Sequence, residues 1–110
     1  MPRDLSGLLH GTLDVLILKA LSWGVMHGYA IAEWIESRGQ GDLVIVDAAL
    51  YKALHRLEAE GAIDAEWGLS DNNRRAKYYS LTARGRSHLR AEAETWRRYV
   101  SAVGRILEAG

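Results

Sequence analysis

Cationic, aromatic and amide side chains gather in two neighbouring stretches of this sequence, residues 51–56 and 73–77. In the first stretch they recur at the spacing of one helix face, and in the second they occupy a polar turn and the residues after it. Such side chains bind phosphate oxygens and contact base edges. The sequence therefore predicts two adjacent contacts with a nucleic-acid duplex. The residues expected to make them are Tyr51, Lys52, His55, Arg56, Asn73, Arg74, Arg75 and Lys77.

The first stretch lies on an expected helix that has Asp47 as its N-cap and ends at Gly61. Leu50, Leu54 and Leu57 recur at helical spacing, so this stripe is expected to face inward. At ~100° per residue the opposite side of the helix carries a polar and cationic face. That outer face consists of Ala48, Lys52, His55, Arg56 and Ala59, with Tyr51 at its edge.

The second stretch is the tip of an expected β-hairpin. Apolar and polar side chains alternate over residues 63–69 and again over residues 78–81, which predicts two strands with one buried face. The Ser-Asp-Asn-Asn segment at residues 70–73 has strong turn chemistry. The buried face of the first strand is expected to hold Ile63, Ala65, Trp67 and Leu69.

Two shorter helices are expected before these elements. The first spans residues 12–23, with Thr12 as its N-cap and Gly24 as its C-terminal stop. The second spans residues 28–38, and its inner stripe consists of Ile31, Trp34 and Ile35. Residues 43–46 are expected to form a short strand or a packed connector, and residues 1–11 a short arm that either docks as a partial helix or stays loose.

The last expected helix begins after Thr82, a good N-cap, and runs to about Leu107. At ~1.5 Å per residue it exceeds 30 Å, too long to lie wholly against so small a domain. Its apolar residues are spaced four, three, four, three and four apart, which is a heptad pattern that favours pairing with a second copy. This seam, the expected dimer interface, consists of Leu89, Ala93, Trp96, Val100, Val103 and Leu107.

Trp96 allows two interpretations. The simpler one is that it fills the core between two paired helices. The other is that two copies of Trp96, with Tyr99 and Val100 beside them, line a cleft between protomers and stack on a planar aromatic effector. Both interpretations are compatible with the same helix pairing.

Catalytic chemistry finds little support in the sequence. His27 and Tyr29 could act as acid–base groups, but they fit better at a helix start, where free N–H groups can hold a phosphate and Tyr29 packs or hydrogen-bonds. The four histidines show no pair at helical spacing, and there is no cysteine, P-loop or nucleophile elbow. We therefore expect no enzyme activity, no metal site and no cofactor.

Composition is that of an ordinary folded domain. The chain has 110 residues, 48% of them hydrophobic and 25% charged, with a formal net charge of zero. A neutral chain counts mildly against DNA binding, but three cations and no acid lie between Asn72 and Ser80. We see no signal peptide or membrane span, and we expect a cytoplasmic protein with no membrane partner.

Three helices followed by a hairpin define a winged helix-turn-helix. The expected fold is therefore mainly α with a small β-hairpin wing. Residues 1–82 would form the DNA-binding domain, and residues 83–110 a long C-terminal dimerisation helix.

Several segments together resemble the PadR-like family of transcriptional regulators. They are GTLDVLILKAL, HGYAI, LYKALHRLEAEG, RRAKYYSLT and the region around Trp96, and they cover nearly the whole chain in order. The length and the single C-terminal helix resemble the short subgroup of this family. The resemblance implies a homodimeric repressor that binds a pseudo-palindromic DNA operator and responds, in many members, to a small planar or aromatic molecule.

The expected recognition helix departs from the family pattern. This chain has Ala48 and Ala49 where the family usually has Gly-Thr or Ser-Thr, and Lys52 where Pro is common. Alanine side chains donate no hydrogen bond, although they can touch a thymine methyl group. These residues and the neutral net charge motivate the alternative function, a winged-helix module that binds a small molecule or a protein and has no specific DNA binding.

Overall fold

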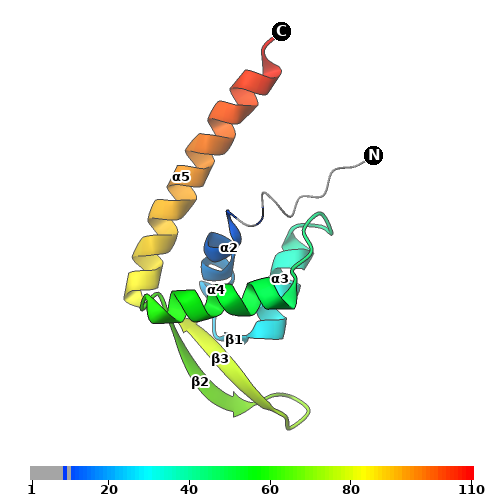
Figure 1. Cartoon of the computed structure of the whole chain (residues 1–110), viewed down its shortest axis with the longest axis vertical. Coiled ribbons are helices and arrows are strands. Elements are labelled where there is room, and N and C mark those ends of the chain that lie inside the picture. Colours follow the sequence, from blue (N-terminus) through cyan, green and yellow to red (C-terminus); the bar gives the residue numbers. More distant parts are fainter. Residues whose placement is uncertain (1–8, 10) are drawn as a thin grey trace.

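The computed structural model describes Leu9 and residues 11–110 (Figure 1). The expected N-terminal arm, residues 1–11, lies outside the described residues apart from Leu9 and Gly11. The fold is mainly helical with a small β wing, as predicted. In chain order the described elements are α2 (Leu13–Leu21), β1 (Met26–His27), α3 (Gly28–Arg38), α4 (Asp47–Ala59), β2 (Ile63–Leu69), β3 (Arg75–Leu81) and α5 (Ala83–Glu108).

The core lies where α2, α3 and α4 meet the base of the hairpin. Each helix contributes the stripe that its apolar spacing predicts, because residues three and four apart share one face. Trp34 is half-buried and packs against this core, and the connector before α4 adds Ile45. The fully buried large side chains are Ile17, Leu18, Ile31, Leu50, Leu54, Leu57 and Ile63.

Helix bounds follow the predictions closely. Thr12 is the N-cap of α2, but the helix ends at Leu21, so Trp23 lies beyond it and is 68% exposed. The prediction for α4 was wrong by one residue. Val46 is the N-cap, and Asp47 is the first helical residue, where its carboxylate still favours the helix dipole.

The sheet has three antiparallel strands in the order β1-β3-β2. Strand β3 pairs with β2 along its whole length, from Ile63 opposite Leu81 to Leu69 opposite Arg75. The two-residue strand β1, which the sequence did not predict, pairs Met26 with Tyr79 on the other edge of β3. Tyr79 is buried there, and desolvation is the main reason why its pKa is raised. Strand β1 thus ties the start of α3 to the wing.

Only the first residues of β2 pack against the core. The expectation that one face of this strand is buried along its whole length was therefore wrong. Ile63 is buried and Ala65 half-buried, but Trp67 and Leu69 are 56% and 67% exposed. The outer half of the hairpin extends beyond the helices, where no element covers it (Figure 1). Trp67 is therefore not a core residue.

The helices α2, α3 and α4 and the sheet form one unit, which we call the head. Helix α5 starts against this head and then extends away from it (Figure 1). The Thr82 hydroxyl accepts a hydrogen bond from the Gly85 N–H at 2.9 Å, which confirms the predicted cap. Leu89 packs against the core, whereas the C-terminal half of the helix extends beyond the other described helices and strands (Figure 1). None of the helices that the structure describes is long and apolar enough to cross a membrane.

Candidate nucleic-acid interface

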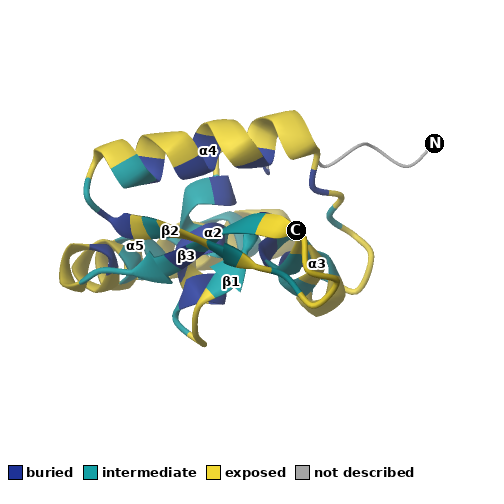
Figure 2. Ribbon diagram, turned by 90° about the horizontal axis from the view of Figure 1, so that it is seen from below, coloured by how far each residue is buried: buried dark blue, intermediate teal, exposed yellow. Residues whose placement is uncertain are grey.

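The wing, the start of α3 and one side of α4 enclose a groove of about 950 Å³. It brings together Tyr51, His55, Arg74, Arg75 and Lys77, five of the residues predicted to contact a duplex. The outer face of α4 beside it is exposed along its length, while the inner face is buried (Figure 2). A convex helix and an adjoining basic hairpin are the surfaces with which winged-helix proteins contact DNA.

Lys52 and Arg56 lie on the other side of α4. They line a second groove, of about 650 Å³, together with Val44, Val46 and Ala48 among others. The predicted contact residues therefore straddle the exposed ridge of α4 rather than form one cluster. A duplex that receives this ridge in its major groove has a phosphate backbone on either side, so the division suits DNA.

Tyr51 holds α4 close to the start of α3. A Cβ atom built on Gly28 would lie 2.8 Å from the phenolic oxygen of Tyr51 and 3.0 Å from its Cε1. Only glycine permits this approach without moving the ring. Tyr51 is 47% exposed, so it both braces the two helices and presents one edge to the groove.

The start of α3 confirms the expected helix start and adds residues to the groove that were not among the predicted duplex contacts. His27 is its N-cap, and its Nδ1 accepts a hydrogen bond from the Ala30 N–H at 3.2 Å. The ring centroid of His27 lies 5.5 Å from that of Tyr78 and 6.4 Å from that of Tyr29. Tyr29 was expected to pack or to hydrogen-bond; it is 71% exposed and lines the groove, so it is not a packed residue.

The turn of the wing is held by hydrogen bonds. The Ser70 N–H and hydroxyl donate to the Arg74 carbonyl at 2.8 and 3.1 Å. Asn73 adopts a left-handed conformation with φ of 61°, which Asn tolerates better than most residues. It belongs to the turn and does not line the groove. The wing tip is thus an ordered support for its cations.

Arg75 stacks over the exposed Trp67 ring, with its guanidinium carbon 4.4 Å from the ring centroid. This contact explains the exposure of Trp67, since the indole supports a cation at the groove wall. The alternation in residues 63–69 could not predict this role. Side chains on one face of a strand recur at every second position, whether that face is buried in a core or exposed in a wing.

Two of the predicted cations form ion pairs with carboxylates. Arg56 makes a bidentate pair with Asp14 of α2, and this hydrogen bond is the main reason why the pKa of Arg56 is raised. The Lys77 Nζ lies 3.3 Å from Glu58 Oε1. Within the described part of the chain, Lys52, Arg74 and Arg75 form no ion pair. Their charge is therefore available to phosphate.

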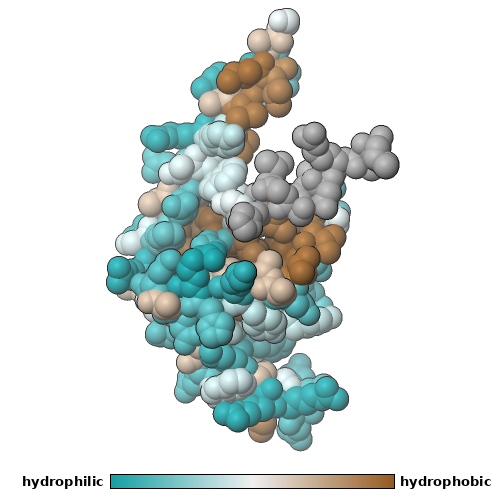
Figure 3. Space-filling model, in the orientation of Figure 1, coloured by the Kyte–Doolittle hydropathy of each residue, from teal (hydrophilic) through white to brown (hydrophobic). Residues whose placement is uncertain are grey.

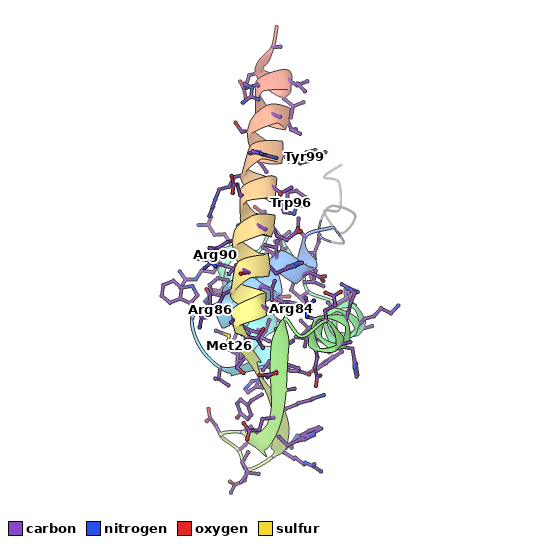
Figure 4. The ribbon with its side chains drawn as sticks, turned by 90° about the vertical axis from the view of Figure 1, so that its left-hand side faces the viewer. Met26, Arg84, Arg86, Arg90, Trp96 and Tyr99 are labelled. Carbon is purple, nitrogen blue, oxygen red and sulfur yellow. The ribbon has the colours of Figure 1, made fainter. Side chains whose placement is uncertain are left out.

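A third groove, of about 450 Å³ and largely apolar, lies along α5. Trp96 and Tyr99 meet edge to face in it, with ring centroids 5.6 Å apart. Both rings project from one side of α5, and Arg86 and Arg90 from the other (Figure 4). Hydrophobic residues gather near the upper end of this helix, with hydrophilic residues beside them (Figure 3). The remaining lining residues are Leu9, Thr12, Leu43, Val100, Val103, Gly104 and Leu107.

The three helices, the wing and the exposed ridge of α4 define a winged-helix protein of the DNA-binding class. The model of the Transcriptional regulator PadR-like family matches residues 17–91. The chain belongs to this family, and it is a transcriptional regulator rather than an enzyme.

Known proteins resemble the chain over almost its whole length. The "Uncharacterized protein X" of Lysinibacillus sphaericus is 31% identical over 104 residues, which are 94% of each chain. A solved PadR family transcriptional regulator from Eggerthella lenta is 30% identical with a TM-score of 0.81, over 96% of this chain and 90% of that one. A transcriptional regulator from Clostridium thermocellum is 27% identical with a TM-score of 0.84, over 93% and 99%.

Proposed function

We propose that the chain represses transcription as a homodimer that binds a pseudo-palindromic operator. In each protomer α4 enters the major groove, and the wing contacts the adjacent backbone through Arg74 and Arg75. The observation that carries this proposal is the exposed ridge of α4, flanked by cations that form no ion pair with any described residue: Lys52 on one side and Arg74 and Arg75 of the wing on the other. Phosphates on either side of a major groove are spaced to meet such a ridge.

Fluorescence anisotropy with the DNA upstream of the gene, at two salt concentrations, tests the DNA contact. Arg74→Ala with Arg75→Ala is expected to weaken binding to every duplex and to lower the salt slope by about two, because each phosphate contact releases counterions. The matched control removes two exposed cations of α5, Arg90→Ala with Arg98→Ala, and leaves the slope unchanged. An unchanged slope in the wing variant contradicts the wing contact.

The same titration decides the alternative function. Ala48 and Ala49 on the exposed ridge favour a module that has lost specific DNA binding, because they donate no hydrogen bond to bases. Equal affinity for the upstream DNA and for an unrelated duplex of the same length would support that alternative.

Dimerisation through α5 is supported by its uncovered apolar seam. In the single chain Val100 and Leu107 are 61% and 76% exposed, and Ile106 beside the seam is 73% exposed. Burying one such side chain contributes about 1.5–3 kcal/mol, so a few on each of two helices can hold a dimer. We propose accordingly that residues 83–110 act as the dimerisation unit and residues 1–82 as the DNA-binding unit.

Light scattering tests this pairing. Val100→Glu with Leu107→Glu is expected to give a folded monomer at micromolar concentration, since both side chains are exposed in the single chain. Ser101→Glu, an exposed position on the same helix but off the seam, keeps the dimer. A dimer of unchanged mass in the double variant would place the interface elsewhere.

The apolar groove beside Trp96 and Tyr99 supports an effector role for these residues and Val100. A planar aromatic molecule that binds there would change the separation of the two heads, provided that it prefers one dimer geometry over the other. Such compounds are expected to quench indole fluorescence and to release DNA together. Trp96→Ala removes both responses, while Trp23→Phe in the head keeps them. Release of DNA from the Trp96 variant would exclude this site.

A further inference from the structure

The first turn of α4 presents apolar side chains where a recognition helix meets base edges. Ala48 and Ala49 are exposed, and Val46 just before them is 61% exposed. In winged and other helix-turn-helix proteins, the first residues of the recognition helix contact the bases. In this chain that position therefore offers methyl groups instead of hydrogen-bonding groups.

The charges around this apolar turn indicate what kind of surface it contacts. Lys52 follows Ala48 by one helical turn on the same face, and it forms no ion pair among the described residues. The wing cations lie on the far side of the ridge. An apolar spot flanked by free cations on both sides complements the major groove, which carries phosphate on both rims.

The major groove has one apolar feature that distinguishes the bases, the C5 methyl group of thymine. Alanine is small enough to let the helix approach until two methyl groups touch. Asp47, the one acid of this turn, lies ~100° around the helix from Ala48, toward Tyr51. Its carboxylate disfavours the thymine O4 acceptor on that flank, so the methyl contact falls on the side of Ala48.

We propose that the first turn of α4 recognises thymine through its C5 methyl group, with Ala48 as the contacting residue; this rests on the proposed DNA binding. Specificity at these positions then comes from apolar contact, whereas Lys52 and the wing supply affinity. The operator is expected to carry a thymine at the same place in each half-site.

Deoxyuridine tests this directly, because it pairs like thymidine and lacks only the methyl group. A duplex selected by the protein from a random library is remade with deoxyuridine at one thymine at a time. We expect about four-fold weaker binding at one thymine or more in each half-site, from the loss of one methyl contact. The Ala48→Gly variant is expected to bind the thymine duplex and the deoxyuridine duplex with affinities within two-fold of each other. In a double-mutant cycle this loss of preference shows that Ala48 and the methyl group interact.

Ala59→Gly is the matched control, since it makes the same change on the outer face of α4 at its far end. It makes the same substitution in the same helix and is expected to keep the four-fold preference. Equal binding of every deoxyuridine duplex by the wild-type protein overturns the inference and leaves DNA binding intact. A preference that persists in Ala48→Gly also overturns it. If no duplex is selected at all, the proposed function itself fails.

Discussion

The contact between Gly85 and Ala62 makes the start of α5 unusually sensitive to one added methyl group. A Cβ atom on Gly85 would lie 2.0 Å from the Ala62 carbonyl oxygen and 2.8 Å from Leu81 Cδ1. The Ala62 carbonyl cannot easily retreat, because it accepts hydrogen bonds from the Thr82 N–H at 3.2 Å and from the Thr82 hydroxyl at 3.0 Å. Gly85→Ala must therefore move the start of α5 away from the Ala62 carbonyl.

The cost follows from the size of that displacement. Overpacking of a rigid contact costs typically ~1–3 kcal/mol, and a backbone oxygen at this distance places Gly85→Ala at the upper end, ~3 kcal/mol. The gain in helix propensity offsets ~1 kcal/mol of this. The net loss of ~2 kcal/mol corresponds to a melting temperature about 8 °C lower for a domain of this size.

Thermal unfolding followed by circular dichroism, at one fixed protein concentration, measures the change. Gly104→Ala in the same helix adds its methyl group where, among the described residues, no atom other than those of its chain neighbours and its own helix backbone lies within 4 Å. It is expected to raise the melting temperature by about 4 °C, since only the propensity term remains. A Gly85→Ala protein that melts within about 2 °C of wild type would refute the claim that α5 is seated on the Ala62 carbonyl.

Three further changes have expected outcomes. Asp14→Asn releases Arg56 from its ion pair, so non-specific DNA affinity rises and the salt slope steepens in an anisotropy titration. Thr82→Ala removes the α5 cap and lowers the free energy of unfolding in urea by ~1 kcal/mol. Because the pKa of Tyr79 is raised on folding, its contribution to stability is present below pH ~10 and is lost as the pH rises through the raised value. Tyr79→Phe is expected to flatten that loss, and an unchanged pH profile would contradict the burial of the phenol.

Local patterns in the sequence predict most of the fold. The bounds of α3, the cap at Thr82 and the inner stripes of three helices follow from apolar spacing and terminal residues, which act over a few positions. Strand β1 was missed because two residues are too few to show alternation, and its pairing with Tyr79 depends on a distant strand. The exposure of Trp67 was missed because spacing reports a strand's faces and not whether another element covers them.

The candidate site is harder to predict for the same reason. The sequence places Arg56 on the outer face of α4, but its partner Asp14 lies 42 residues away on another helix. The roles of His27 and Tyr29 in the groove depend on how α3 sits against the wing, which no local pattern encodes. Only the type of each side chain signalled them, a histidine and a tyrosine at a glycine-marked helix start.

The first turns of α5 rest on the head, at Gly85 against the Ala62 carbonyl and at Leu89 against the core, while the rest of the helix extends away from it (Figure 1). From Gly85 to Leu107, at ~1.5 Å per residue, the arm is about 33 Å long. A tilt of about 5° at the foot therefore moves the far end by about 3 Å, close to the axial rise of one base pair. A small change in how α5 is seated on the head is thus amplified at the far end of the helix. In a pair joined through α5, the spacing of the two heads then depends on how α5 is seated at Ala62, Gly85 and Leu89, which are not among the residues proposed to touch DNA.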